Sequence, residues 1–277
     1  MAISRRTLLK SLVATGIGAT TGAGAYGALY ERDAIGLTSV EVPVADLPPG
    51  LAGLRIGLMT DVHRSRWVSA EDVTAAVTLL LAAAPDLIVL GGDYVTWGDP
   101  AFVGPAAEAL GELSAPHGVF GVLGNHDSDR EMADALSDKR VQMLKDARTR
   151  LTINGEPLHL AGLRYWTRRP ADVASVLRGA TGTVVLLAHD PRRLRDAAAL
   201  NVPLVLSGHT HGGQVVLPGI GPLAARRFPI VSGIGRQART SIFVSRGVGT
   251  VYVPIRINCP PEVAIVTLTP DPADRPA

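Results

Sequence analysis

Five short apolar runs in this chain each lead directly into a polar group suited to acid–base or metal chemistry. The runs cover residues 55–60, 87–90, 119–123, 184–188 and 204–207. Stretches with helical spacing lie between them, at 69–83, 106–113, 172–177 and 192–200. Strands that alternate with helices predict βαβ units and a largely parallel inner sheet. The polar groups then stand beyond the carboxyl ends of strands, where sites form in α/β sheets.

The chain changes character after His211. Apolar β-type runs separated by Gly and Pro follow, at 214–217, 241–245, 251–257 and 263–268, and they predict a second, more antiparallel sheet. Two stacked mixed β-sheets flanked by helices make a four-layer αββα sandwich of the α/β class. No Ser/Gly-rich tract, charge block or repeat divides the chain after residue 50. We therefore expect one domain over 51–277, preceded by a linker or first strand over 26–50.

The polar groups form an ordered set. They are Asp61-Val62-His63, Gly91-Gly92-Asp93, Gly124-Asn125-His126-Asp127, His189 and Gly208-His209-Thr210-His211. Asp93 follows Asp61 by 32 residues and Asn125 follows Asp93 by 32, which is one strand-helix-strand step. This spacing is consistent with all of the groups reaching one rim of the sheet.

The residue types of the set limit its chemistry. The chain has a single cysteine, Cys259, which excludes intramolecular disulfides and thiolate-rich zinc or iron–sulfur sites. Five of the seven histidines belong to the set, and we interpret the other two, His117 and His159, as structural. Carboxylate, imidazole and amide ligands without thiolates suit Mn, Fe or Zn.

The ordered set resembles the signature of the calcineurin-like metallophosphoesterase superfamily. That signature is Asp-x-His, Gly-Asp, Gly-Asn-His-Asp/Glu, a lone His and Gly-His-x-His. The segment Gly-His-Thr-His-Gly-Gly-Gln at 208–214 and the motifs at 244–250, 254–256 and 260–262 are similar to the exported YkuE-like phosphodiesterase branch. One departure is visible, because Tyr94-Val95-Thr96-Trp97 follows Asp93 where many members have Asp or Asn. The resemblance implies an αββα phosphoesterase fold and an enzyme that hydrolyses phosphoric esters.

The resemblance also implies roles for the set. Two divalent ions, bridged by Asp93, would be held by two ligand groups, one of Asp61, His63 and His211 and the other of Asn125, His189 and His209. A hydroxide shared by both ions would attack the phosphorus atom. His126 would protonate or stabilise the departing oxygen. Asp127 would orient the His126 imidazole or, alternatively, cap the helix that follows.

Residues beside the motifs have weaker assignments. Asp190, which precedes Pro191, reads as a helix N-cap rather than a metal ligand. Arg64 and Arg246 are candidate phosphate contacts, although exposed arginines are usually only solvated. Trp67 and Trp97 either shape the mouth of the site or pack at its rim.

The N-terminus predicts export from the cytoplasm. Residues 4–10 read Ser-Arg-Arg-Thr-Leu-Leu-Lys and resemble a twin-arginine signal, and the triplet Ala23-Gly24-Ala25 matches a cleavage site. We therefore assign 1–25 as the signal, with an N-terminal membrane helix as the alternative. This places the protein in the periplasm, in the cell wall or on the outer face of the cytoplasmic membrane. The 27 basic and 25 acidic residues form no basic stripe that predicts nucleic-acid binding.

The leading interpretation is an exported, metal-dependent phosphodiesterase. Its expected partners are the twin-arginine machinery and a phosphoester, for which lipid- or envelope-linked phosphates are candidates. A first alternative is a pyrophosphate hydrolase of a nucleotide-linked lipid precursor. A second is a secreted metal-binding protein without turnover, which would not require His126. A third alternative is another metallohydrolase, with a lactamase-like or amidohydrolase fold. Those folds place their His-x-His motif early in the chain, whereas here it begins at residue 209, which argues against this alternative.

Overall fold

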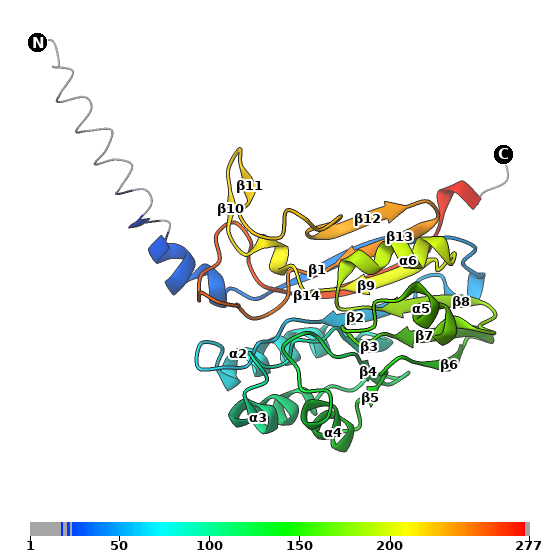
Figure 1. The fold of residues 1–277 in the computed structure, drawn as a ribbon, viewed down its shortest axis with the longest axis horizontal. Coiled ribbons are helices and arrows are strands. Elements are labelled where there is room, and N and C mark those ends of the chain that lie inside the picture. The colour runs from blue at the N-terminus through cyan, green and yellow to red at the C-terminus, as the bar shows by residue number, and fades with distance from the viewer. Residues whose placement is uncertain (1–17, 19–20, 23, 275–277) are drawn as a thin grey trace, which may run out of the picture.

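Two six-stranded sheets stack face to face in the computed structural model, which describes residues 18, 21–22 and 24–274 (Figure 1). The first sheet has the order β1 (Gly36–Val44), β14 (Glu262–Pro270), β2 (Arg55–Met59), β3 (Leu87–Leu90), β4 (Val119–Gly121) and β5 (Gln142–Met143). The second has the order β12 (Gly233–Gln237), β13 (Thr240–Val244), β9 (Leu204–Ser207), β8 (Thr183–Leu187), β7 (Glu156–Gly162) and β6 (Ala147–Ile153). A small hairpin of β10 (Val216–Leu217) and β11 (Gly221–Pro222) projects from the body.

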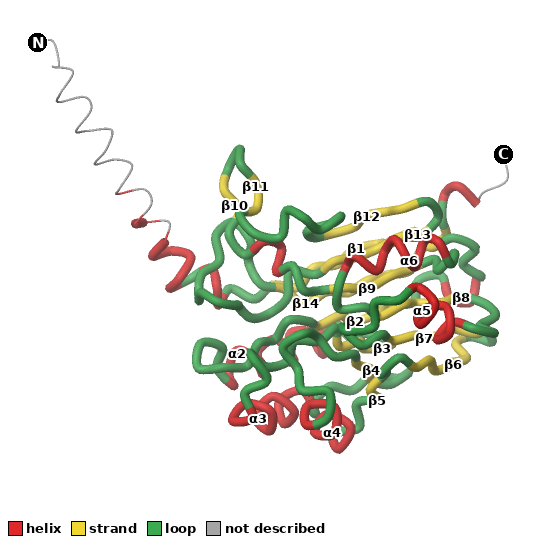
Figure 2. The backbone as a smooth tube through the Cα atoms, viewed as in Figure 1, coloured by secondary structure: helices red, strands yellow, loops and turns green. Residues whose placement is uncertain are grey.

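Helices cover the outer face of each sheet (Figure 2). The first sheet carries α2 (Ala70–Ala82), α3 (Pro100–Leu110) and α4 (Glu131–Asp138), and the second carries α5 (Pro170–Leu177) and α6 (Leu194–Ala199). Short 3-10 turns occur at η1 (Glu31–Asp33), η2 (Pro49–Leu51), η3 (Pro191–Arg193), η4 (His211–Gly213) and η5 (Pro272–Asp274). The predicted four-layer αββα sandwich is confirmed.

Three hydrophobic clusters fill the spaces between the four layers. Alternation along β2 shows how one strand serves two of them, because Ile56 and Leu58 face the second sheet whereas Met59 faces the helices. The cluster between the sheets also contains Phe120 and Phe243, one from each sheet. Central strands buried on both faces explain why their sequences are continuously apolar rather than alternating.

The distribution of strands between the sheets differs from the prediction. The early strands do not form one sheet, because β2, β3 and β4 lie in the first and β8 and β9 in the second. The late strands do not form an antiparallel sheet of their own either. β13 pairs with β9 in parallel, and β14 lies between β1 and β2. A strand-helix-strand period predicts parallel neighbours but does not encode which of two sheets a strand joins.

Several element boundaries also differ. The run at 251–257 is a loop, and the helix predicted at 106–113 is α3, which begins at Pro100 because the Asp99 carboxylate accepts the N–H of Ala101. The hairpin of β6 and β7 was missed. Its turn is Asn154-Gly155, with φ of 50° and 83°, which is a strong hairpin signal in the sequence.

The start of the described chain packs onto the body of the protein. The carbonyl of Gly27 accepts the N–H of Arg256 at 3.1 Å, and the Glu31 carboxylate accepts the N–H of Cys259 at 2.6 Å. Most of the predicted export signal, including Arg5 and Arg6, lies outside the described residues, so residues 1–25 as a signal remain a prediction. No helix in the described part of the chain is long and apolar enough to cross a membrane.

Candidate metal centre and active site

The loops after β2, β3, β4, β8 and β9 meet at one edge of the sandwich. Backbone hydrogen bonds join them, from Asp61 N–H to the Gly92 carbonyl at 2.9 Å and from His63 N–H to the Asp93 carbonyl at 3.0 Å. The Gly208 N–H donates to the carbonyl of His189 at 3.2 Å, which joins the loops of the second sheet. The two sheets thus bring the sequence-predicted polar groups to one place.

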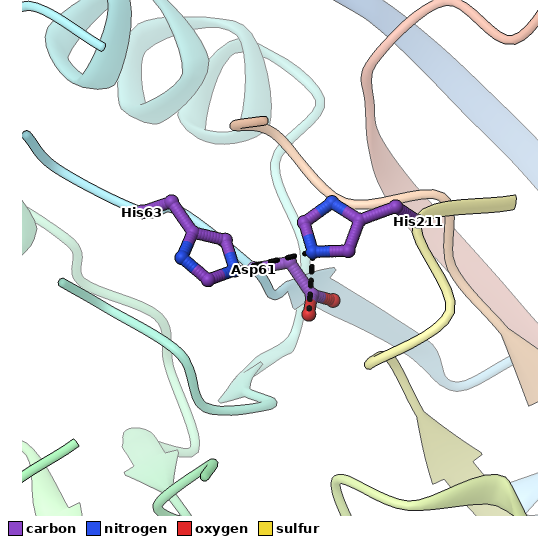
Figure 3. Close-up of side chains that lie close together, drawn as sticks. All are labelled: Asp61, His63 and His211. Atoms are coloured by element: carbon purple, nitrogen blue, oxygen red, sulfur yellow. Dashed lines mark hydrogen bonds and ion pairs between the residues drawn. The ribbon is translucent and has the colours of Figure 1, made fainter. Parts of the chain in front are cut away.

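The first group of side chains contains Asp61, His63 and His211 (Figure 3). All three are buried, and their ligand atoms lie within 4.8 Å of one another. The Nε2 atoms of the two histidines are 3.1 Å apart, and Nε2 of His211 lies 3.6 Å from Oδ1 of Asp61. Three donors that converge from β2 and β9 are arranged to surround one cation.

A second group contains Asp93, His189 and His209, whose ligand atoms also lie within 4.8 Å of one another. Nδ1 of His209 and Nε2 of His189 are 3.2 Å apart. The Nδ1–H of His189 donates to the carbonyl of Gly91 at 2.8 Å, which leaves the Nε2 lone pair directed into the group.

Asp93 lies between the two groups. Its Oδ2 atom is 3.5 Å from Nε2 of His63 and 3.2 Å from Nε2 of His189. Its other oxygen, Oδ1, accepts the N–H of His126 at 2.8 Å and is thereby fixed. The Asp93 carboxylate therefore lies within reach of both groups, and its role as a bridge between two ions stays a prediction.

Asn125 supplies an unpaired polar atom beside these groups. Its Oδ1 atom is buried and has no hydrogen-bond partner among the described residues. A buried acceptor without a partner costs about 1–3 kcal/mol, so its retention indicates a ligand that protein atoms do not provide. An amide oxygen together with carboxylates and imidazoles fits a pair of divalent metal ions.

The electrostatics of the two groups favour neutral rings at His63 and His209 and a positive charge beside the carboxylates. Burial lowers the pKa of His63 to about 3 and that of His209 to about 4, so both rings keep free lone pairs. Burial also acts to lower the pKa of His189, but Asp93 and Asp61 raise it to about 10. Burial raises the pKa of Asp61 to about 6, with Asp93 contributing in the same direction. The carboxylates thus stabilise a cation between them.

The backbone is strained at most of these positions. Five of the seven predicted ligands have left-handed φ values between 49° and 72°, namely Asp61, His63, Asp93, His209 and His211. Such conformations cost about 1–3 kcal/mol per residue and persist where the surrounding structure fixes them. Two glycines make the crowding possible, because an added Cβ would lie 2.0 Å from the Asp93 carboxylate at Gly124 and 2.2 Å from the Asp61 carboxylate at Gly208.

His126 lies beside the first group with its ring tilted against Trp97. The Trp97 N–H donates to Nδ1 of His126 at 3.0 Å, and the ring centroids are 4.5 Å apart. The His126 ring also meets that of His63 edge-on at 4.9 Å. The Trp97 side chain is exposed and contacts Tyr252, so Trp97 forms part of the mouth of the site.

Asp127 does not occupy either of its predicted positions. Its Oδ2 atom accepts the N–H groups of Asp93 and Gly124 at 2.7 and 2.8 Å, and Oδ1 accepts that of Tyr94 at 2.8 Å. The carboxylate therefore makes no hydrogen bond to the His126 ring and does not cap α4. Both predictions for Asp127 are wrong, because it is a positioning residue that fixes the loop carrying Asp93.

The two arginines predicted to contact phosphate have partners within the protein. Arg64 donates to the carbonyls of Ser65 and Val68, and Arg246 forms an ion pair with Glu262 at 2.5 Å. Both guanidinium groups thus have protein partners outside the two ligand groups, so the described contacts give no support to their assignment as phosphate contacts. Asp190 accepts the N–H of Arg192 at the start of η3, as predicted for an N-cap.

Two residues that support the centre were not predicted from the sequence. Thr96 places its hydroxyl 3.2 Å from Nδ1 of His63, within the segment where the chain departs from the superfamily pattern. Arg256 is fully buried and donates to the carbonyls of Gly249 at 2.6 Å and Cys259 at 3.0 Å. The Gly249 N–H in turn donates to the carbonyl of Asp61 at 2.7 Å. The motif at 254–256 had pointed to Arg256 without indicating this role.

Comparison with known proteins agrees with this geometry. The family described as calcineurin-like phosphoesterase matches residues 54–213. The metallophosphoesterase YkuE of Bacillus subtilis is 30% identical over 96% of this chain and 98% of its own length. The phosphodiesterase YaeI of Escherichia coli is 28% identical over 96% of this chain and 99% of its own.

Solved structures share the fold at low sequence identity. The NAD nucleotidase of Haemophilus influenzae superposes with a TM-score of 0.52 and 14% identity, covering 76% of this chain and 54% of its own. The sulfate thiohydrolase SoxB of Thermus thermophilus superposes with a TM-score of 0.50 and 13% sequence identity, and the match covers 83% of this chain and 59% of the SoxB chain. The matched family, the αββα sandwich and the two ligand groups agree: the chain belongs to the calcineurin-like metallophosphoesterase superfamily and is a metal-dependent hydrolase of phosphoric esters.

Proposed function

We propose that this protein hydrolyses phosphodiesters at a centre of two divalent metal ions, outside the cytoplasm. The observation that carries the proposal is the position of the Asp93 carboxylate, one oxygen of which lies within 3.5 Å of ring nitrogens from both ligand groups. The name of the E. coli relative, a phosphodiesterase aligned over nearly the whole chain, favours diesters over monoesters.

The side chains divide the ligand positions between the two ions. One ion would be held by Asp61, His63 and His211, the other by Asn125, His189 and His209, with Asp93 shared. Two such ions supply Lewis-acid charge for the phosphoryl oxygens and lower the pKa of a water molecule. The donor set suits Mn, Fe or Zn.

His126 has the geometry to serve the leaving group. Because Nδ1 accepts the Trp97 N–H, a neutral His126 ring carries its proton on Nε2. Hydrolysis adds water across a P–O bond and yields a monoester and an alcohol, and the added water supplies the proton that the alcohol oxygen gains. The Nε2–H of His126 can donate a hydrogen bond to that oxygen and stabilise its developing negative charge, and burial, which lowers the pKa of His126, keeps the ring in this neutral form.

The substrate proposal is tested with bis(p-nitrophenyl) phosphate and p-nitrophenyl phosphate. Chelator-treated protein is reloaded with Mn²⁺, Fe²⁺ or Zn²⁺, and kcat/KM is measured for both esters. We expect metal-dependent turnover with at least about a tenfold preference for the diester. Turnover without metal would contradict the proposal, as would a preference for the monoester. Faster cleavage of a nucleoside diphosphate sugar would favour the pyrophosphate hydrolase, and metal binding without turnover the non-catalytic alternative.

Export through the twin-arginine pathway is proposed from residues 4–10. Replacing Arg5 and Arg6 together by Lys should leave the protein in the cytoplasm, whereas Lys10→Arg should not change its location. Cell fractionation and immunoblotting measure the outcome. Export of the double variant at the normal level would contradict the proposed route.

A further inference from the structure

An apolar groove opens directly beside the metal centre. Its volume is about 660 Å³, which lies in the range of small-molecule binding sites. One wall is the segment 223–228, which follows the β10–β11 hairpin, and the other is the loop 251–253. The floor is formed by residues 209–215, so His209 and His211 line the groove as well as belonging to the two ligand groups.

The walls are apolar and open to solvent. Leu223, Tyr252 and Val253 expose 54%, 75% and 49% of their surfaces, respectively. Phe228 closes the inner end, where its ring meets that of His209 edge-on at 5.2 Å. Contiguous exposed apolar surface is unfavourable in water and usually marks a binding site.

The groove is held in shape by Gln214. Its Nε2 donates to the carbonyls of Val251 and Val253 at 3.2 and 2.9 Å, and its Oε1 accepts the N–H of Val251 at 3.0 Å. The Gln214 side chain is buried, and the backbone at Gln214 has a left-handed φ of 57°. The loop of one wall is therefore fixed to the floor, and the groove is preformed.

Arginine side chains at one end of the groove indicate how a ligand would be oriented in it. Arg227 lines the groove, is exposed and forms no ion pair with the other described residues. Beyond Phe228 a second hollow of about 480 Å³ is lined by Arg168, Arg192, Arg193 and Arg195, of which Arg192 and Arg193 form ion pairs with Asp190 and Asp196. A molecule in the groove thus has apolar walls along its body, and the positive charge near Phe228 comes from Arg227, Arg168 and Arg195, which form no ion pair with the other described residues.

We propose that the groove binds the alkyl chain of an amphiphilic phosphodiester whose phosphate lies at the metal centre. The inference rests on the proposed function, since it identifies the substrate class of that centre. A hydrophobic chain bonded to an anionic phosphodiester complements both the apolar walls and the positive inner end. A purely polar diester would leave the exposed side chains of Leu223 and Val253 in contact with water.

The test compares methyl and octyl p-nitrophenyl phosphate, with the octyl ester kept monomeric so that no micelle or membrane is present. Each buried methylene favours binding, so the wild-type protein should show a kcat/KM for the octyl ester at least about tenfold higher than for the methyl ester. Leu223→Asp and Val253→Asp should each reduce this ratio to about one. Leu200→Asp, at a half-exposed position after α6 that does not line the groove, is the matched control and should keep the full ratio.

A binding measurement separates this inference from the proposed function. Calorimetry with octylphosphonate and methylphosphonate should show the same preference for the longer chain, lost in Leu223→Asp. If octylphosphonate binds in this way but neither ester is hydrolysed, the proposed function fails and the groove assignment holds. Equal values for the two chain lengths in the wild type, or a preference that survives in both groove variants, would overturn the groove assignment. Circular dichroism confirms that each variant is folded.

Discussion

The main-chain N–H of Trp97 donates a hydrogen bond to Nδ1 of His126 over 3.0 Å. This contact fixes the ring and leaves Nε2 to carry the proton of a neutral imidazole. His126→Ala removes a hydrogen bond to the departing oxygen and should therefore lower kcat for bis(p-nitrophenyl) phosphate by about 10²–10³-fold.

The metal content of His126→Ala should stay at two ions, because His126 belongs to neither ligand group. Steady-state kinetics and elemental analysis of the same samples measure both effects. His117→Ala is the matched control, since His117 lies outside the site, and it should keep wild-type turnover. Unchanged turnover in His126→Ala would remove this residue from the mechanism.

Asp127→Asn tests the positioning of the Asp93 loop. Both oxygens of Asp127 accept main-chain N–H groups, and an amide nitrogen cannot accept them. We expect the free energy of unfolding to fall by about 1–3 kcal/mol and metal affinity to fall about 10–100-fold. Denaturant unfolding and metal titration measure these quantities. Asp138→Asn, at the exposed end of α4, should change neither, and an Asp127→Asn protein with wild-type metal affinity would contradict the assigned role.

Gly208→Ala tests the close packing of the Gly208 backbone against the Asp61 carboxylate. An added Cβ would lie 2.2 Å from the Asp61 carboxylate and the Thr60 hydroxyl, so one of them must move. We expect the first metal ion to be lost and turnover to fall by at least about tenfold. Gly104→Ala is the matched control, because its Cβ meets open space within α3 and should stabilise the helix by about 0.5–1 kcal/mol. Equal activity of the two variants would contradict the packing described for Asp61.

Arg256→Lys tests the buried guanidinium that supports the loop 246–250. The Arg256 Nη2 donates to three main-chain carbonyls and Nη1 to a fourth, a pattern that a single ammonium group cannot reproduce. Thermal unfolding should show a loss of at least about 2 kcal/mol. Arg130→Lys, whose side chain is 91% exposed, should leave the midpoint unchanged. A midpoint for Arg256→Lys equal to that of the wild type would show that these hydrogen bonds contribute nothing.

The fold class and the gathering of the polar groups could be predicted because both depend on local patterns. Apolar runs with helical stretches between them define βαβ units, and polar residues at strand ends must meet at one edge. The assignment of strands to sheets could not be predicted in this way. The second sheet receives β13 from late in the chain, whereas β14 returns to the first sheet beside β1. That choice depends on packing between distant segments.

Residue roles followed a similar division. Asp93 lies between the two groups, because its motif places it after β3, at the edge where the strand ends meet. The roles of Asp127 and Arg246 could not be predicted because their partners, the N–H of Tyr94 and the Glu262 carboxylate, are remote in sequence. An aspartate or an arginine can act in the reaction, and it can equally well hold a loop in place through hydrogen bonds. Only the three-dimensional contacts distinguish the two.

The central claim is that Asp93 joins two metal ions in one centre. Elemental analysis of Mn²⁺-loaded protein, combined with diester turnover, tests it most directly in the wild type, in Asp93→Asn and in the control Asp172→Asn, at a half-exposed position in α5. We predict two ions per chain in the wild type and the control, and at most one ion with turnover reduced at least about 10³-fold in Asp93→Asn. Two tightly bound ions and undiminished turnover in Asp93→Asn would contradict the claim.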